Sequence, residues 1–213
     1  MDTLLSFALL AFTSFITLIN PVGVMPVFIG MTANLDDAAR TAIARKASIV
    51  AFIILVLFAL SGQLLFKFFG ISVDSFRVVG GIIFFLMGQD MLRARLSPIK
   101  LSDEEAVQEY VSDISITPLA VPMITGPGAI TNAIVLMEDA KTTAMKATLF
   151  LVMAGIMLIT FLVLWGAARV SKVLGETGNK ILIRLMGLIV MVIAVEFFFS
   201  GLTPILRRIF EIG

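Results

Sequence analysis

Six long apolar stretches, separated by short polar connections, make up most of this 213-residue chain. A helix that crosses a bilayer needs about 20 mostly apolar residues. The stretches that meet this requirement are residues 4–31, 47–69, 71–92, 114–137, 147–168 and 181–202. The pattern therefore predicts an all-α membrane protein with six transmembrane helices.

The polar residues are densest between the third and fourth stretches. Residues 93–113 form the longest polar segment and include Asp103, Glu104, Glu105 and Glu109. Because three apolar stretches lie on each side, we interpret this segment as a linker between two three-helix repeats. The predicted boundaries are 1–92 for the first repeat and 114–213 for the second, within one membrane domain.

The two halves share landmarks in the same order. The sequence Arg-Val-Val-Gly at 77–80 recurs as Arg-Leu-Met-Gly at 184–187, and the same offset places Gln89 opposite Glu196. A nearly equal offset aligns Pro21 with Pro127. Since each repeat crosses the membrane an odd number of times, the second must enter from the opposite face. This predicts inverted repeats, an arrangement that many secondary transporters share.

Composition excludes several classes of function. Hydrophobic residues make up 59% of the chain, charged residues 15%, and the mean hydropathy is +1.07. Without cysteine or histidine, the chain has no disulfide and lacks the usual zinc ligands. We expect no cofactor, and no hydrolase constellation is visible, so we do not expect an enzyme. The net charge of +1 gives no reason to expect nucleic acid as a partner.

Lysine and arginine are distributed unequally over the connections. Those after the first, third and fifth stretches hold ten such residues, whereas the opposite side holds six. Cytoplasmic loops usually carry the excess. The distribution therefore predicts that both termini lie outside the cytoplasm.

Proline and glycine interrupt the first and fourth stretches. The first contains Asn-Pro-Val-Gly-Val-Met-Pro at 20–26, and the fourth contains prolines at 118 and 122 followed by Gly-Pro-Gly at 126–128. Each proline lacks an N–H and displaces the carbonyl four residues earlier, so the carbonyls of Ile16, Thr17 and Val22 should lose their partners. A helix restarting after Gly128 would present free N–H groups, which favour an anion such as a carboxylate.

These interruptions have two interpretations. Proline kinks can simply shape the packing of membrane helices. Two discontinuous helices at corresponding positions of inverted halves favour instead a substrate site near the middle of the membrane. Thr125, Thr131 and Asn132 lie close enough in sequence to add side-chain hydrogen bonds there.

Glu196 is the clearest ionisable residue inside a predicted span. A charged group in the bilayer costs about 3 kcal/mol on insertion scales. Glu196 is therefore a candidate for ion coupling as a proton-carrying carboxylate. The alternative is a protonated or hydrogen-bonded structural residue that faces another helix.

Three segments resemble the MarC family of bacterial and archaeal inner-membrane proteins. They are Asn20 to Phe28 with Thr32, Asp74 to Gly81, and Pro118 to Pro122 leading to Gly126-Pro127-Gly128-Ala129-Ile130. The resemblance implies six transmembrane helices. The family includes SnatA-type transporters of small neutral amino acids such as glycine and alanine, driven by an ion or proton gradient.

If this activity carries over, the two broken helices frame the substrate. The candidate binding residues are Asn20, Pro21, Gly23, Thr125, Gly126, Pro127, Gly128, Thr131 and Asn132. The alternative functions are a passive channel and an exporter of another small polar solute. The expected partners are a small neutral amino acid and membrane lipid, and a homo-oligomer is left open by the sequence.

Overall fold

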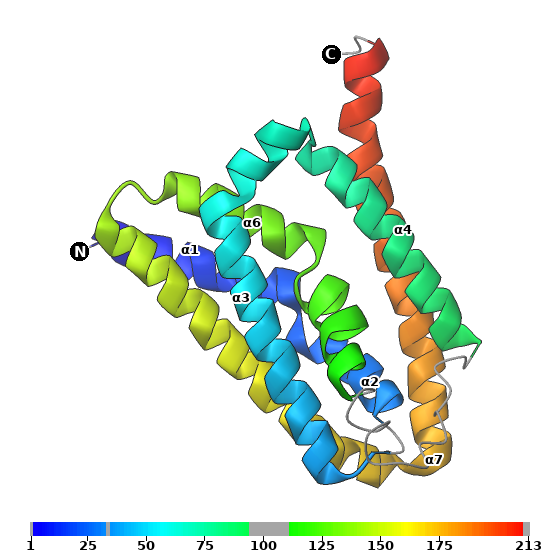
Figure 1. Cartoon of the computed structure of the whole chain (residues 1–213). Helices are drawn as coiled ribbons and strands as arrows, with labels where there is room; N and C mark the ends of the chain where they lie inside the picture. The colour runs from blue at the N-terminus through cyan, green and yellow to red at the C-terminus, as the bar shows by residue number, and fades with distance from the viewer. Residues whose placement is uncertain (1, 33–34, 94–110, 211–213) are drawn as a thin grey trace.

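The computed structural model describes residues 2–32, 35–93 and 111–210 (Figure 1). All regular elements in these ranges are helical, which confirms the predicted all-α class. They are α1 (Asp2–Ile19), α2 (Pro21–Met31), α3 (Asp37–Phe69), α4 (Val73–Leu92), η1 (Ser115–Ile124), α6 (Pro127–Asp139) and α7 (Thr143–Phe210). Most of the predicted 93–113 linker, residues 94–110, lies outside the described residues.

Five helices of the described chain are long and apolar enough to cross a membrane. A sixth span results when the bent pair Val111–Ile124 and Pro127–Asp139 is counted as one. Two of the five lie within α7, which leaves helical geometry at Gly175 (φ 64°, ψ −175°). We call Thr143–Ala167 the first arm of α7 and Ile181–Phe210 its second arm.

The surface of this protein carries many large apolar side chains. Leu64, Phe68 and Leu151 are each more than 70% exposed. A soluble monomer rarely exposes apolar patches of this extent. In the hydrocarbon of a bilayer the same side chains are in a favourable solvent, so the exposed surface agrees with an integral membrane protein.

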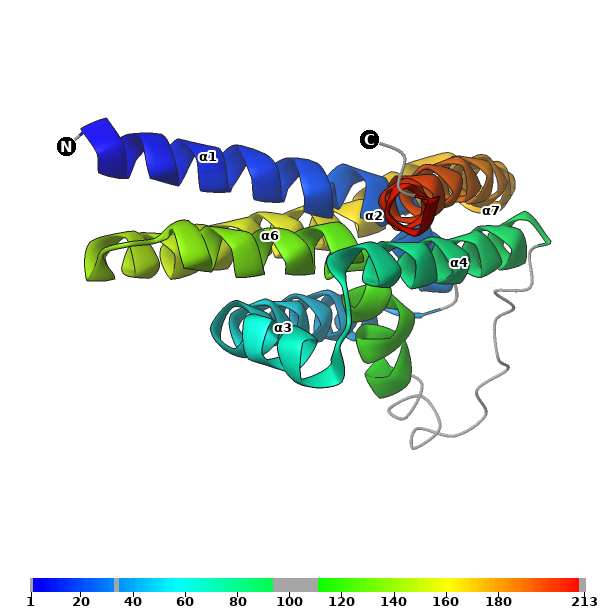
Figure 2. The same cartoon turned by 90° about the horizontal axis from the view of Figure 1, so that it is seen from above.

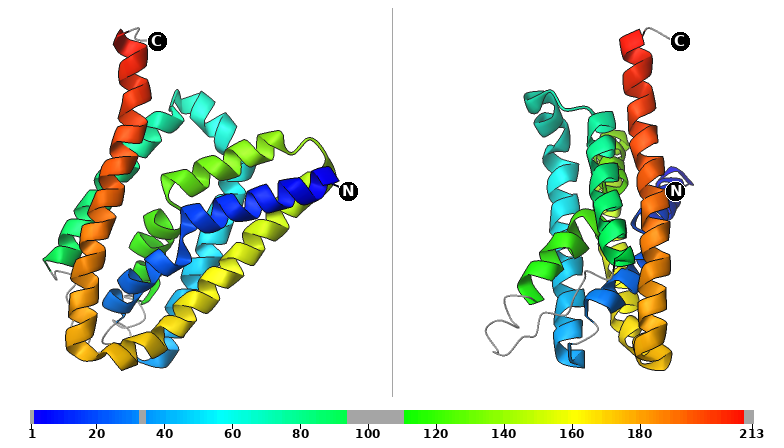
Figure 3. Two further views of the ribbon diagram at one scale, coloured as in Figure 1. Left: turned by 180° about the vertical axis from the view of Figure 1, so that it is seen from behind. Right: turned by 90° about the vertical axis from the view of Figure 1, so that its right-hand side faces the viewer.

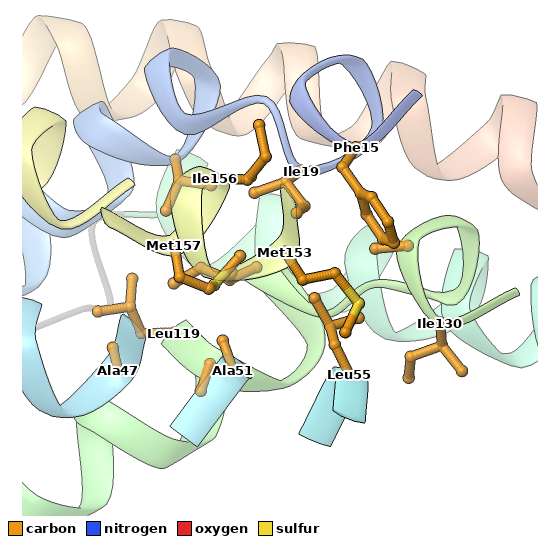
Figure 4. Close-up of a cluster of buried hydrophobic side chains, with 14 of the residues drawn as sticks. Phe15, Ile19, Ala47, Ala51, Leu55, Leu119, Ile130, Met153, Ile156 and Met157 are labelled. Carbon is orange, nitrogen blue, oxygen red and sulfur yellow. The ribbon is translucent and has the colours of Figure 1, made fainter. Parts of the chain in front are cut away.

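One apolar core joins α1, α2, α3, η1, α6 and the first arm of α7. Figure 4 shows part of it, with labelled side chains from all of these elements except α2 pointing toward one another. Its labelled members are at most 4% exposed: Phe15, Ile19, Ala47, Ala51, Leu55, Leu119, Ile130, Met153, Ile156 and Met157. The alanines on α3 allow the neighbouring helices to approach closely. We call this group of helices the bundle.

The remaining long helices, α4 and the second arm of α7, lie side by side and antiparallel (Figures 1 and 3). We call them the helix pair, and Figure 2 shows it beside the bundle. Within the bundle, α3 runs antiparallel to the first arm, and α1–α2 runs opposite to η1–α6 (Figure 1).

Glycine stands where the two helices of the pair meet. A Cβ added to Gly81 would lie 2.7 Å from both the Ala194 carbonyl oxygen and the Phe198 backbone nitrogen. A Cβ on Gly187 would lie 2.8 Å from the carbonyl oxygen of Gly88. Both distances are shorter than real Cβ contacts. The two backbones therefore approach more closely than any larger residue allows, as in other small-residue packing between membrane helices.

The close packing continues to the end of the pair, where charged residues join it. A Cβ on Gly201 would lie 2.5 Å from the carbonyl oxygen of Asp74. Arg208 donates to Asp74 Oδ2 at 3.3 Å, and Arg77 Nη1 lies 3.5 Å from Asp74 Oδ1. Exposed ion pairs of this kind contribute at most about 1 kcal/mol. Backbone packing rather than charge therefore holds the pair together.

We expect Gly81→Ala to lower the free energy of unfolding by about 1–3 kcal/mol, the usual range for overpacking. The added methyl group would collide with backbone atoms of the second arm, which cannot rotate away as a side chain could. Denaturation by heat or SDS in detergent micelles measures the effect. Gly155→Ala is the matched control, because a Cβ there meets nothing within 4 Å. Equal stabilities of the two variants would contradict the close contact.

Candidate functional site

The first break separates α1 from α2 at Asn20. This residue has left-handed backbone angles (φ 45°, ψ 67°), and its Oδ1 accepts a hydrogen bond from Gly23 N–H at 3.1 Å. Pro21 begins α2, where a missing N–H costs no helical hydrogen bond. A Cβ on Gly23 would lie 2.5 Å from Asn20 Nδ2, so this cap requires glycine. The expectation that the Ile16 carbonyl loses its partner is wrong, because Asn20 N–H donates to it at 3.1 Å.

The second break separates η1 from α6 and bends the chain by 65°. Within η1, Thr117 (φ −127°, ψ 122°) and Val121 (φ −127°, ψ 123°) are extended. Each precedes a proline, whose ring disfavours helical angles in the preceding residue. The prolines at 118 and 122 therefore make this segment irregular before the Gly-Pro-Gly sequence is reached.

Thr125 closes the last turn of η1. Its backbone N–H and its hydroxyl both donate to the carbonyl oxygen of Ala120, at 2.9 Å and 2.7 Å. The residue is 1% exposed. In this conformation the hydroxyl holds the shape of the break, so Thr125 acts as a positioning residue for the start of α6.

The helix restarts at Pro127, two residues earlier than a restart after Gly128 would give. Gly126 is extended (φ −62°, ψ 166°) and its carbonyl accepts the first helical hydrogen bond, from Ile130 N–H at 3.1 Å. Proline is favoured at the first helical position, because its fixed φ suits the helix. No side chain caps this end, and the N–H groups of Gly128 and Ala129 have no partner among the described residues.

Helix α4 covers one side of this break. A Cβ on Gly80 would overlap with the ring of Pro127, so α4 approaches the start of α6 as closely as glycine permits. A Cβ on Gly126 would lie 3.4 Å from Cζ of Phe84. The glycine at the repeated Arg-Val-Val-Gly motif is therefore explained by contact with the second break.

Helix α1 and the second arm cover the other side. A Cβ on Gly128 would lie 3.1 Å from Leu18 Cδ2 and 3.6 Å from Phe197 Cε1. The rings of Phe84 and Phe197 are themselves in contact, with centroids 5.8 Å apart. Because Leu18 lies two residues before Asn20, the structure brings the ends of both broken helices together.

Two polar atoms next to the break have no hydrogen-bond partner. Thr131 Oγ1 and Asn132 Nδ2 are buried, and neither finds a donor or acceptor within the described part of the chain. Thr131 and Asn132 follow Gly128 by three and four residues, so each lies within about 60° of Gly128 around the axis of α6. A buried polar group without a partner costs about 1–3 kcal/mol, so these atoms call for an explanation.

Glu196 lies beside the site rather than in it. Its side chain is exposed, and it makes no hydrogen bond or ion pair with another residue of the described ranges. The next residue, Phe197, contacts Gly128. Neighbouring helical residues differ by about 100° around the axis. The structure therefore places Glu196 near the break without bringing it together with Thr131 and Asn132.

The sequence interpretation missed the aromatic residues of the site. Phe84 and Phe197 looked like ordinary apolar positions among 18 phenylalanines, and Leu18 carried no signal at all. Gly80 had one signal, its place in the repeated motif. Contacts between helices distant in sequence select these residues, and no local pattern marks them.

The site is electrically neutral. The residues that contact the break, Leu18, Gly80, Phe84 and Phe197, carry no charge. Across residues 2–32, 35–93 and 111–210, no group of three or more His, Cys, Asp or Glu side chains could hold a metal ion. Recognition at this site would therefore rely on backbone N–H groups and neutral side chains.

Comparison with known proteins agrees with the resemblance in the sequence motifs. Residues 5–206 match the family described as MarC family integral membrane protein. The chain is 40% identical over 202 residues to a UPF0056 membrane protein of Methanocaldococcus jannaschii, covering 93% of this chain and 97% of that protein. It is 36% identical over 194 residues to one of Pyrococcus horikoshii, covering 91% and 93%.

A bacterial relative shows a comparable sequence identity. The UPF0056 membrane protein YvbG of Bacillus subtilis is 37% identical over 199 residues, covering 92% of this chain and 94% of that protein. No solved structure gives a significant match. The helical spans, the motifs at both breaks and a family match over nearly the whole length lead to one conclusion: the chain belongs to the MarC family of integral membrane proteins.

Proposed function

We propose that this protein is a secondary transporter of small neutral amino acids, such as glycine and alanine, that works by alternating access. The observation that carries the proposal is the pair of buried, unpartnered atoms Thr131 Oγ1 and Asn132 Nδ2 beside an uncapped helix start. A ligand that forms hydrogen bonds here would satisfy groups that the protein leaves unpaired.

An amino acid carboxylate fits the polarity of this helix end. The free N–H groups of Gly128 and Ala129 and the amide of Asn132 are donors, and the positive end of the α6 dipole favours an anion. The ammonium group would need acceptors, and the candidates are the carbonyls of Thr17 and Val22, which the sequence predicts to lose their donors to Pro21 and Pro26. A zwitterion needs both kinds of partner, and its net neutrality matches a site without charged side chains.

The size of the substrate is limited by the surrounding residues. Neighbouring side chains leave little room at the two glycines, since a Cβ on Gly126 would lie 3.4 Å from Phe84 Cζ and one on Gly128 would lie 3.1 Å from Leu18 Cδ2. A large side chain would have to displace an aromatic ring. This supports a small substrate, in agreement with the SnatA-type activity that the family resemblance implies.

The arrangement of the helices supports an inverted-repeat mechanism. Each element of the first half runs opposite to its counterpart in the second half (Figure 1). The site is also lined from two bodies, since Gly128 and Leu18 belong to the bundle and Phe84 and Phe197 to the helix pair. Rocking of one body against the other would open the break alternately toward the two sides of the membrane.

We further infer a location in the inner membrane with both termini outside the cytoplasm. The unequal distribution of lysine and arginine over the connections supports this orientation.

Counterflow distinguishes the transporter from the passive channel. Proteoliposomes preloaded with unlabelled glycine should take up labelled glycine faster than empty ones, because a carrier exchanges substrate through a site that faces one side at a time. A channel gives no such stimulation. Equal uptake by loaded and empty vesicles would reject alternating access, and a panel of amino acids in the same assay defines the substrate range.

We expect Thr131→Val combined with Asn132→Leu to abolish glycine exchange without destabilising the protein. Each lost hydrogen bond should weaken binding by about tenfold, while removal of unpaired buried polar atoms leaves the free energy of unfolding unchanged or higher. Thr160→Val is the matched control, since that buried hydroxyl already donates to the Ile156 carbonyl. If the double variant exchanges glycine normally, the site lies elsewhere.

Glu196→Gln tests proton coupling. If Glu196 carries the proton, the variant should lose accumulation driven by a pH gradient but keep counterflow, because exchange at equilibrium requires no net proton movement. Both rates are measured on the same proteoliposomes. Full gradient-driven accumulation in the variant would remove Glu196 from the coupling mechanism.

A further inference from the structure

A groove runs along the outer surface of the bundle between α3 and the first arm of α7. Its volume is about 280 Å³, and its walls are almost entirely apolar. The residues that line it are Arg45, Ser48, Ile49, Phe52, Ala154, Met157, Leu158 and Phe161. Ser48 contributes no free hydroxyl proton, because it donates to the Ala44 carbonyl at 2.9 Å. Arg45 is therefore the single charged group of this lining.

Arg45 is placed to bind an anion. Its side chain is exposed, and it makes no hydrogen bond or ion pair with any residue that the structure describes. It lies in the third turn of α3, two residues before the predicted apolar span 47–69 begins. A long cationic side chain at this position reaches the level of the lipid headgroups.

The first arm marks the same level. Trp165 follows Phe161 by four residues, so it lies on the same face of the helix, one turn beyond the groove. It is 43% exposed, and the Arg169 guanidinium lies over its ring at 4.8 Å. Tryptophan is enriched where a membrane protein passes from hydrocarbon to headgroups. One end of the groove therefore meets the interface, and the rest extends into the hydrocarbon.

We propose that this groove is a binding site for an anionic phospholipid, with the phosphate on Arg45 and an acyl chain along the apolar walls. The shape and the charge both fit this occupant. A hydrocarbon chain fits the apolar walls, which are formed by Ile49 and Phe52 on α3 and by Ala154 and Leu158 on the first arm. These side chains offer no hydrogen bonds to a peptide. A free phosphate would have nothing to contact beyond Arg45. The site is on the outside of the bundle, separate from the break at Gly126.

Trp165 is the single tryptophan of the chain and reports on the site directly. Full-length protein is reconstituted into vesicles that contain phosphatidylcholine and phosphatidylglycerol, with brominated acyl chains on one lipid at a time. Bromine quenches tryptophan fluorescence only at short range. Brominated phosphatidylglycerol should quench Trp165 with an apparent affinity about fivefold higher than brominated phosphatidylcholine, as one interfacial cation is worth about 1 kcal/mol.

Three variants separate the contributions. Arg45→Gln should remove the preference for phosphatidylglycerol, whereas Arg208→Gln, which neutralises an exposed arginine on the second arm, should keep it. Ala154→Phe fills the groove from an exposed position and should reduce quenching by both lipids. Equal quenching by the two lipids in the wild type, or an unchanged preference in Arg45→Gln, would overturn the proposal. So would competition by inorganic phosphate, which has no acyl chain.

Discussion

The hydrogen-bonding requirement of the backbone inside a membrane governs the structure of this protein. Hydrocarbon offers no partner to a peptide group, so irregular backbone is tolerated only where it contacts protein or lines a cavity. Around the second break the chain meets the requirement in two ways. The backbone N–H and the hydroxyl of Thr125 both donate to the Ala120 carbonyl. Pro127, which has no N–H, begins the next helix. Among the described residues, the buried side-chain atoms without a partner and the free N–H groups at the start of α6 lie on one short stretch, at Gly128, Ala129, Thr131 and Asn132.

The enclosure of these unpaired groups depends on how closely the neighbouring helices approach the start of α6. Gly80 lets α4 contact Pro127, and Gly128 lets α1 and the second arm contact the start of α6. The helix pair must itself be tightly packed to hold Phe84 and Phe197 in place over the break, and Gly81, Gly88 and Gly187 permit this. In the helix pair and at the second break, small residues let helices make extensive close contacts. Such contacts matter in a membrane, where hydrophobic burial gives little net driving force for helix association.

The division into a bundle and a helix pair connects this packing to transport. The bundle has a continuous core of buried side chains (Figure 4), and the two helices of the pair make close backbone contacts with each other. Side chains of the pair, among them Met91, Ile183 and Met186, also pack against that core, so a rocking motion would have to rearrange these contacts. The proposed substrate site lies between the two bodies, and the proposed lipid groove lies on the bundle alone. Lipid binding would therefore act on one of the two bodies.

The all-α class, the presence of five to six membrane-spanning helices and the irregular backbone at Asn20 and Gly126 could be predicted from the sequence, because these features depend on local chemistry. Twenty apolar residues require a helix in a bilayer, and proline removes a hydrogen bond wherever it stands. Thr131 and Asn132 could also be singled out, since few polar residues come after the Gly-Pro-Gly sequence. The predicted restart of α6 was two residues too late and the prediction for the Ile16 carbonyl was wrong, because both depend on backbone angles at Gly126 and Asn20.

The residues that surround the breaks, by contrast, are selected by tertiary packing. Leu18, Phe84 and Phe197 come from three helices and look like any other lipid-facing position in the sequence. The exposure of Glu196, the hydrogen bonds of Thr125 and the groove beside Arg45 are likewise results of packing. In a chain whose apolar residues face lipid as readily as protein, hydrophobicity does not distinguish the inside from the outside. That distinction arises from the contacts between helices far apart in the sequence.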